Sequence, residues 1–237
     1  MDNTATTIKL GAHRAFTERR LLLVDVEPQD NLTSGVGHKG FAAPAGTFYN
    51  ALTTIDATTD ARAFVIPTAI DTLKLIPADR HLTGAEIEMV TLSAREERLR
   101  ELLRSVRGDY DYIFIDCPPS LGLLTLNALV AADAVLIPMH CVYFALEGLA
   151  DLVGTMRRVR ASLNPELDIE GVLLTMFDER TNLGQQVAHD GRTICTHKVF
   201  RTGIPRHGRP GQAPSPGTPV RPQHGNTPTP RPRPRRG

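Results

Sequence analysis

The sequence is poor in the residues that would mark a disulfide-bonded, zinc-binding or membrane-spanning protein. Its three cysteines, Cys117, Cys141 and Cys195, are far apart and form no CxxC pair, which argues against a disulfide framework or a zinc site. No apolar run approaches the roughly 18–20 residues that span a bilayer, and the N-terminus has no apolar signal segment. We therefore expect reduced thiols, a cytoplasmic location and no membrane contact.

Acidic residues are absent from the C-terminal end of the chain. Residues 1–200 carry 19 Lys and Arg and all 26 Asp and Glu, whereas residues 201–237 carry eight Arg and no acid. The same end holds ten of the 18 prolines and almost no large aliphatic side chains. Such a composition cannot bury enough apolar surface to offset the entropy lost on ordering. We predict one folded domain over residues 1–206 and a disordered tail over residues 207–237.

Within the predicted domain, short apolar runs alternate with amphipathic stretches. The predicted strands are 21–25, 64–66, 73–76, 111–116, 134–138 and 171–176. The predicted helices are 83–106, 121–131, 145–163 and 183–194. Strands that are apolar on both faces are typical of a parallel sheet covered by helices. The pattern therefore predicts an α/β domain with a doubly wound, mostly parallel sheet.

Two of the predicted strands end in a carboxylate, Asp25 and Asp116. One Asp after a strand is most simply a helix cap or a turn residue. Ligands of such sheets, however, bind beyond the carboxyl ends of the strands, where these two side chains would meet. Magnesium in phosphate sites is held by few carboxylates together with water and phosphate oxygens. The pair therefore favours a shared magnesium site over two separate caps.

A series of motifs around these residues matches a known family. Residues 21–31 read LLLVDVEPQDN and are followed by Thr33-Ser34-Gly35, and residues 110–122 read YDYIFIDCPPSLG. Further matching stretches follow in the same order: 125–129, 131–133, 135–138, 143–149, 171–177, 180–184 and 204–206. At these residues the chain resembles the ParA/Soj family of chromosome- and plasmid-partitioning ATPases, which are P-loop NTPases. The resemblance covers about residues 3–206, and the ordered series is far more specific than any single motif.

The resemblance implies a function and a set of partners. Members of this family hold ATP and Mg²⁺ between the two subunits of a homodimer. The ATP-bound dimer binds DNA without sequence preference, and a ParB-like partner stimulates hydrolysis. For this chain the resemblance therefore implies partitioning of a chromosome or plasmid by a nucleoid-associated cytoplasmic protein.

The resemblance also implies roles for individual residues. Asp116 stands at the Walker B carboxylate, which acts on magnesium through water, and Asp25 at a switch Asp near the metal. Glu27 stands where the family usually has a second Asp that positions the attacking water, so it is the implied catalytic residue; its extra methylene changes that geometry. The implied nucleotide-binding residues are Asn3, Thr4, Ala5, Asp25, Asp116, Pro205 and Arg206. The implied metal ligands are Thr4, Asp25 and Asp116, and the implied DNA contact is Arg206.

The N-terminus departs from the family pattern. A phosphate loop needs glycines whose N–H groups cradle phosphate, a Lys for the terminal phosphates and a Ser or Thr for magnesium. The family's form is KGGVGKT, and residues 4–12 resemble the helix that follows it. Thr4 then stands at the magnesium-binding Thr, Asn3 at the Lys and Asp2 at the last Gly. The expected βαβ unit therefore lacks both its first strand and its phosphate loop.

Two interpretations of this departure remain open at the level of the sequence. In the first interpretation, translation starts upstream of Met1 and the complete protein is a partitioning ATPase. In the second interpretation, the gene is a damaged copy. In the second case the product is a nucleotide-free remnant that acts only as a binding partner or has no function. In either case, we expect the chain as written to be inactive as an ATP hydrolase.

The C-terminus departs as well, because the resemblance stops abruptly at His207. Out-of-frame reading of a GC-rich gene would produce such a change, and a genuine basic tail is the competing explanation. We favour the first. A membrane-associated relative resembling MinD would need a C-terminal amphipathic helix, which a proline-rich tail cannot form.

Overall fold

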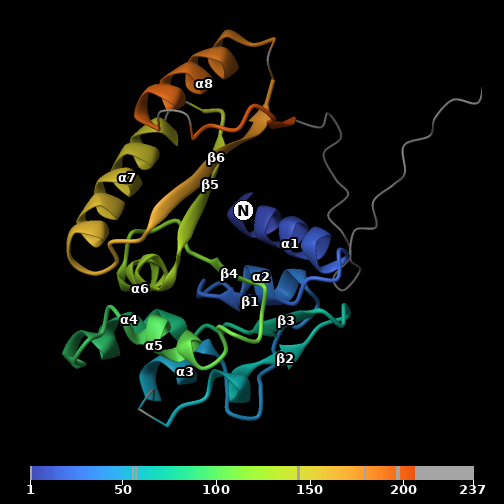
Figure 1. The fold of residues 1–237 in the computed structure, drawn as a ribbon, viewed down its shortest axis with the longest axis vertical. Coiled ribbons are helices and arrows are strands. Elements are labelled where there is room, and N and C mark those ends of the chain that lie inside the picture. Colours follow the sequence, from blue (N-terminus) through green and yellow to red (C-terminus); the bar gives the residue numbers. More distant parts are fainter. Residues whose placement is uncertain are drawn as a thin grey trace, which may run out of the picture.

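The computed structural model describes residues 2–205 except positions 55, 57, 143–144, 179 and 196–197. Its strands form two sheets, one of four strands in the order β2-β3-β1-β4 and one of three in the order β5-β6-β7 (Figure 1). All pairings are parallel except the antiparallel pair β2–β3. The strands are β1 (Leu21–Asp25), β2 (Ile66–Pro67), β3 (Leu73–Ile76), β4 (Tyr112–Asp116), β5 (Ala134–His140), β6 (Asp168–Phe177) and β7 (Ile204–Pro205).

Helices cover both faces of the strands, as a doubly wound fold requires. Helices α1 and α2 lie on one face, and α6 and α7 lie on the other, to the left of the strands in Figure 1. The helices are α1 (Asp2–Ala15), α2 (Asn31–Gly35), α3 (Phe48–Thr54), α4 (Leu82–Glu88), α5 (Arg98–Arg104), α6 (Leu123–Ala131), α7 (Ala145–Ser162) and α8 (Asn182–Ile194), with 3₁₀ turns η1 (Ala61–Phe64) and η2 (Met89–Thr91). Among the described residues, no helix is both long and apolar enough to cross a membrane.

Strand β1 lies in the middle of the first sheet because its side chains are apolar on both faces. Alternate residues of a strand point to opposite faces. Leu22 and Val24 pack in the cluster that α5 and α6 cover, whereas Leu21 and Leu23 pack in the cluster that contains Ala15 of α1. All five residues of β1 are buried. The predicted strand at 21–25 is therefore confirmed, with helices on both sides of it.

Helix α6 connects the two halves of the molecule. Leu124 and Ala128 belong to the hydrophobic cluster under β1, whereas Leu129 and Val130 pack with Met156 and other residues of α7. One helix therefore contributes to the core of the first sheet and to the packing that supports the second.

Two predicted elements differ from the structure. The helix expected over 83–106 is interrupted: α4 and η2 end at Thr91, and α5 begins at Arg98. The helical conformation ends at Leu92, which is extended (φ −83°, ψ 143°), and the chain then turns through Ala94, whose φ is 48°. Phe64, expected in a strand, belongs to η1, and the strand that follows is only two residues long.

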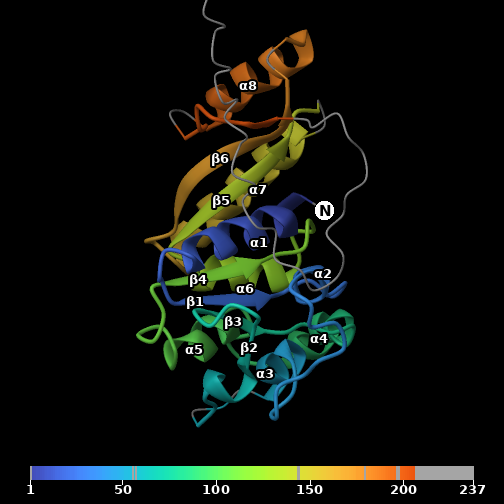
Figure 2. The same ribbon diagram turned by 90° about the vertical axis from the view of Figure 1, so that its right-hand side faces the viewer.

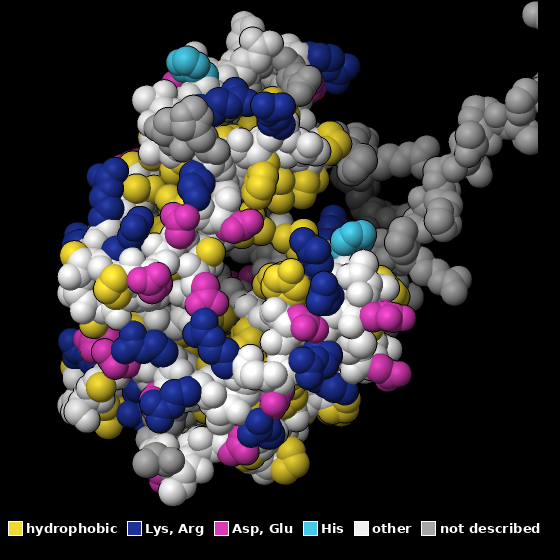
Figure 3. Space-filling view, in the orientation of Figure 1, with side chains coloured by type: hydrophobic (Ala, Val, Ile, Leu, Met, Phe, Trp, Pro, Cys, Tyr) yellow, Lys and Arg dark blue, Asp and Glu magenta, His cyan; other side chains and the backbone are white. Residues whose placement is uncertain are grey.

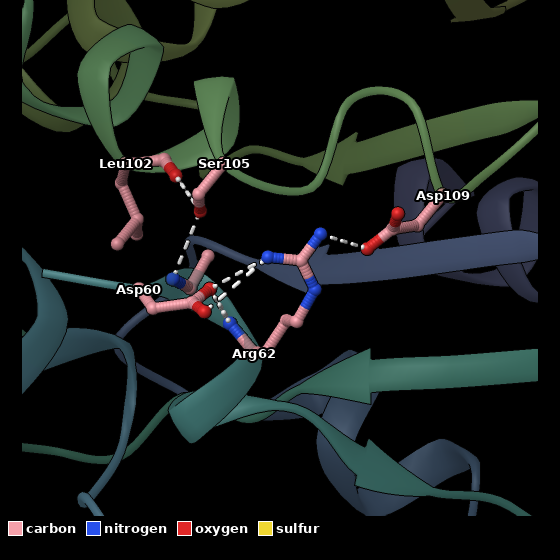
Figure 4. Close-up of polar contacts among 6 residues, drawn as sticks. Asp60, Arg62, Leu102, Ser105 and Asp109 are labelled. Atoms are coloured by element: carbon pink, nitrogen blue, oxygen red, sulfur yellow. Dashed lines mark hydrogen bonds and ion pairs between the residues drawn. The ribbon is translucent and has the colours of Figure 1, made fainter.

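A polar cluster at the surface joins η1 to the end of α5 and to the turn before β4 (Figure 4). The Arg62 guanidinium lies 2.6 Å from Asp109 and 3.3 Å from Asp60, and the Ala61 N–H donates to Ser105 Oγ at 3.0 Å. The two ion pairs are about half exposed, so water screens them and each contributes little to stability.

Candidate functional site

The candidate site lies at the carboxyl ends of β1 and β4, where the structure places Asp25 and Asp116 side by side. The two strands are parallel and in register, and Asp25 is the direct neighbour of Asp116. Both side chains are buried. Two buried carboxylates this close repel each other when both are ionised. The arrangement therefore favours a proton or a cation at this end of the sheet.

Asp25 is held by hydrogen bonds to both of its oxygens. Its Oδ2 accepts from the hydroxyl of Thr33 at 2.6 Å and from the Thr33 N–H at 2.8 Å. Its Oδ1 accepts from the Glu27 N–H at 3.1 Å. The pKa of Asp25 is raised to about 7. Burial is the largest cause; the donors from Thr33 and Glu27 lower the pKa, and the charge of Asp116 adds to the increase. Asp25 thus organises the loop after β1 rather than facing open space.

Asp116 has one oxygen with a partner and one without. Its Oδ1 accepts from the Thr7 hydroxyl at 3.1 Å, whereas its Oδ2 is buried and has no hydrogen-bond partner among the described residues. Burial raises the pKa of Asp116; the hydroxyls of Thr4 and Thr7 lower it, and the charge of Glu27 raises it. A buried, unpartnered carboxylate oxygen is costly unless a ligand satisfies it.

These features fit a magnesium ion held mainly through Asp116. Among the described residues, no group of three or more His, Cys, Asp or Glu side chains could enclose a metal by itself. Magnesium in nucleotide sites uses one or two carboxylates, with water and phosphate oxygens as the remaining ligands. The unpartnered Oδ2 of Asp116 and the nearby Thr4 hydroxyl suit that role better than Asp25, whose oxygens are already bonded.

Glu27, the residue expected to position water, lies at the same end of the sheet. It is buried, and its Oε2 accepts from Asn31 Nδ2 at 2.8 Å. Its charge raises the pKa of Asp116. The Asn31 amide therefore fixes the orientation of the Glu27 side chain.

The other residues implied by the resemblance lie in two separate places. Asn3, Thr4 and Ala5 form the first turn of α1, where Thr4 is buried and Ala5 is exposed. Pro205 ends β7 at the outer edge of the second sheet and is exposed. Arg206 lies outside the described residues, as does the whole of the predicted tail. The structure thus brings Thr4 to the Asp25–Asp116 pair and leaves Pro205 on the other sheet.

Two threonines of the site were not singled out from the sequence. Thr33 donates to Asp25 and also accepts the Ala78 N–H at 3.0 Å, so it joins the loops that follow β1 and β3. Thr7 donates to Asp116. Thr33 stands in the motif Thr33-Ser34-Gly35, which was a usable signal. For Thr7 the only signal was its place one helical turn after Thr4, on the same side of α1.

Comparison with known proteins identifies the family. Residues 2–169 match the model of an AAA domain. The sporulation initiation inhibitor protein Soj of Bacillus subtilis is 49% identical over 217 residues, which cover 92% of this chain and 84% of that protein. The chromosome partitioning protein ParA of Myxococcus xanthus is also 49% identical over 217 residues, covering 92% of this chain and 75% of that protein. The chain belongs to the ParA/Soj family of partitioning ATPases.

Solved structures agree with the P-loop α/β fold of this ParA/Soj family member. A cobyrinic acid a,c-diamide synthase from Mycobacterium smegmatis with bound ADP and magnesium has a TM-score of 0.77 and 34% identity, covering 86% of this chain and 82% of that one. A plasmid partition protein from Borrelia burgdorferi has a TM-score of 0.69 and 26% identity, covering 85% of this chain and 83% of that one. The first of these neighbours carries its nucleotide and its metal together.

Proposed function

We propose that this family member acts in chromosome or plasmid partitioning, with MgATP at the carboxyl ends of β1 and β4. The observation that carries the proposal is the Asp25–Asp116 pair, with the Oδ2 of Asp116 buried and without a partner. Magnesium supplies charge neutralisation of the phosphates when bound. Asp116 and Thr4 hold the ion, Asp25 keeps the loop after β1 in place, and Glu27 orients the attacking water.

The complete function includes partners that the family implies. The ATP-bound form is a homodimer, it binds DNA without sequence preference, and a ParB-like protein stimulates its hydrolysis. Arg206 is the proposed DNA contact of the dimer, and it joins Pro205 in the proposed nucleotide site. Dimerisation, DNA binding and hydrolysis all require bound ATP in this proposal, and tight binding of ATP requires a phosphate-binding loop.

We expect the 237-residue chain itself to bind ATP weakly or not at all. At the positions that the resemblance assigns to the last Gly and the Lys of the phosphate loop it carries Asp2 and Asn3, so a negative charge stands where the phosphates would lie and the positive charge is missing. Asn3 cannot supply that charge. Calorimetry with ATP and magnesium measures the affinity, and dissociation in the low micromolar range would contradict this expectation.

The decisive test of the catalytic assignment uses a chain in which an apolar strand and a KGGVGK loop replace residues 1–3, so that the Lys of the loop directly precedes Thr4. Slow, magnesium-dependent release of phosphate is expected from this chain. Asp116→Ala should abolish it, because the ion loses its protein carboxylate, whereas Glu27→Asp should leave it intact or raise it. Unchanged turnover in Asp116→Ala would show that the magnesium assignment is wrong.

A second candidate function is a nucleotide-free binding partner of other partition proteins. The observation in its favour is Asn3, an uncharged residue at the position that the resemblance assigns to the phosphate-binding Lys. Size-exclusion chromatography of the 237-residue chain with its ParB-like partner, with and without MgATP, distinguishes the two. Complex formation that does not depend on nucleotide would support the binding partner over the ATPase.

A further inference from the structure

An open groove of about 590 Å³ lies on the face of the strands opposite α1. Its floor is the first part of α6 with the loop before it; α7 forms one wall, and α4, η2 and the segment after η2 form the other. Figure 1 shows α6 between α7 and α4, and in Figure 2, which is viewed from the side of α1, α6 and α7 lie behind the strands. Every lining residue lies between positions 86 and 163, so the middle of the chain builds the whole groove.

The floor of the groove exposes apolar side chains. Leu123 and Leu126 of α6 are half-buried, and Leu121, in the loop before α6, is 47% exposed. On the left side of Figure 3, where Figure 1 places α4, α6 and α7, hydrophobic side chains lie among charges of both signs. An apolar patch with a polar rim is typical of a surface that binds another molecule.

The wall formed by α4 and η2 is apolar on two sides. Leu82, Ala85 and Met89 are fully buried in the core under β1. Ile87 and Val90 lie three positions apart, on the same outer side, and are 76% and 56% exposed. A helix that is apolar all round is normally buried all round. The outer side of this wall therefore lacks a cover in the single chain.

The two walls carry charges of opposite sign. On the α7 wall, the exposed Arg158 has no ion pair among the described residues. On the α4 wall, Glu86 accepts the Leu124 N–H at 3.2 Å and likewise has no cationic partner within the described part of the chain. The other charged residues that line the groove, Arg95 and Glu96, pair with each other at 2.9 Å. The groove therefore offers one positive and one negative charge to an occupant, from opposite sides.

The shape and the charges together define this occupant. A space between two helices of one layer accepts a third helix, whose side chains interdigitate with those of its neighbours. This helix needs an apolar stripe for the floor, Lys or Arg along the edge near Glu86, and Asp or Glu along the edge near Arg158. Residues 201–237 cannot supply it, because they contain ten prolines and no acid. Each described helix of the chain packs within its own fold, so none is free to enter the groove of a second copy.

We propose that this groove docks one amphipathic helix of a partner protein, with its apolar stripe on the groove floor, a basic edge at Glu86 and an acidic edge at Arg158. The two charged edges also fix the direction of the docked helix, because turning it end for end would place like charges together.

The docked helix touches the loop that joins Asp116 to α6. Leu121 and Gly122 of this loop line the groove. A Cβ atom on Gly122 would collide with the Oε1 atom of Glu86, so the loop and the α4 wall are in direct contact. Docking therefore acts next to the segment that follows the proposed magnesium ligand. This consequence rests on the proposed function, whereas docking itself needs no nucleotide.

The test uses the complete 237-residue chain and a fluorescent peptide of about 20 residues, designed as a helix with a Leu stripe, Lys along one edge and Glu along the other. Fluorescence anisotropy without nucleotide measures binding, and we expect a dissociation constant of about 1–100 µM. Leu121→Asp should weaken binding by about tenfold or more, because it places a charge against the Leu stripe. Val142→Asp, at an apolar position of similar exposure outside the groove, is the matched control and should have no effect.

Charge reversal on the protein gives the sharper measurement. The unmodified chain should prefer the peptide with mixed edges over a second peptide with Lys along both edges. Arg158→Glu should reverse this preference by about tenfold, because the α7 wall then attracts Lys.

The same order of preference in both proteins, or no binding of either peptide, would overturn the proposal. Self-association of the unmodified chain that Leu121→Asp removes would also overturn it, because a second copy would then cover the groove. No nucleotide is present in these measurements, so a failure of docking leaves the proposed ATPase function untouched.

Discussion

At the scale of single residues, the site is built from acids that the fold keeps away from water. Asp25 is fully buried among three hydrogen bonds, and its register partner Asp116 has an oxygen with no partner. Thr33 compensates part of the burial of Asp25 by donating both its hydroxyl and its N–H. Without a cation nearby, burial therefore disfavours the ionised forms of Asp25 and Asp116.

This resistance predicts how the stability of the chain depends on pH. The pKa of Asp25 is about 7 in the folded chain, against about 3.9 in an unfolded one. Between these values the folded state holds a proton that the unfolded state releases. The free energy of unfolding should therefore fall by up to about 1.4 kcal/mol per pH unit as the pH rises from about 4 to about 7, and should level off above that.

Urea unfolding at several pH values measures this slope, and Asp25→Asn is the variant that tests its origin. The slope should become much shallower in Asp25→Asn, and a part should remain because the pKa of Asp116 is also raised by burial. A slope that is identical in the variant would show that Asp25 is not the titrating group.

At the scale of elements, a single buried amide holds the interrupted region between η2 and α5. Asn127 of α6 accepts the Leu99 N–H at 3.1 Å and donates to the Arg95 carbonyl at 2.8 Å and to the Leu123 carbonyl at 3.0 Å. Its side chain is fully buried. The first turn of α5 and the segment before it are thus tied to α6 through one side chain.

We predict that Asn127→Ala destabilises the chain by about 1–3 kcal/mol, because it removes the partner of the buried Leu99 N–H and of the partly buried Arg95 carbonyl. Thermal or urea unfolding measures the change. Asn182→Ala, at an exposed position that begins α8, is the matched control and should change stability by less than about 0.5 kcal/mol. Equal effects of the two substitutions would contradict the role of the buried amide.

The same region shows what the sequence could and could not reveal. Long apolar runs predicted the strands at 21–25 and 111–116 well, because an unbroken run of apolar residues leaves a strong local signal, although only the first of these strands is buried along its whole length. The break in the helix expected over 83–106 was missed, because the amide that stabilises it comes from residue 127, far away in the chain. Asp25 and Asp116 were predicted to meet because both end parallel strands, whereas the division into two sheets depends on which edges find partners in three dimensions.

At the scale of the whole molecule, the charges are divided between the folded domain and the basic C-terminal end. All 26 acidic residues precede residue 201, and eight Arg follow with no acid among them. Clustered Arg binds phosphate backbones without regard to base sequence. DNA binding by this chain therefore has two candidate sources, the basic C-terminal end and the ATP-bound dimer.

We predict that the C-terminal end binds DNA without nucleotide. The logarithm of the association constant should fall by roughly 0.9 per log unit of salt concentration for each phosphate neutralised. Fluorescence anisotropy on residues 1–237 and residues 1–206, with and without ATP, separates the two sources. Loss of low-salt binding on truncation, with no response to ATP, is the expected result. Unchanged binding by residues 1–206 would assign the contact to Arg206 or to the folded domain instead.

Helix α6 has a consequence for how this sequence can evolve. None of its nine residues is exposed, and its two polar side chains, Thr125 and Asn127, are buried as well. A helix on a protein surface has an outer side on which substitutions accumulate freely, whereas α6 meets a core on one side and α7 on the other. Over evolutionary time we therefore expect residues 123–131 to change more slowly than the exposed positions of α7, whether or not the chain retains its ATPase activity.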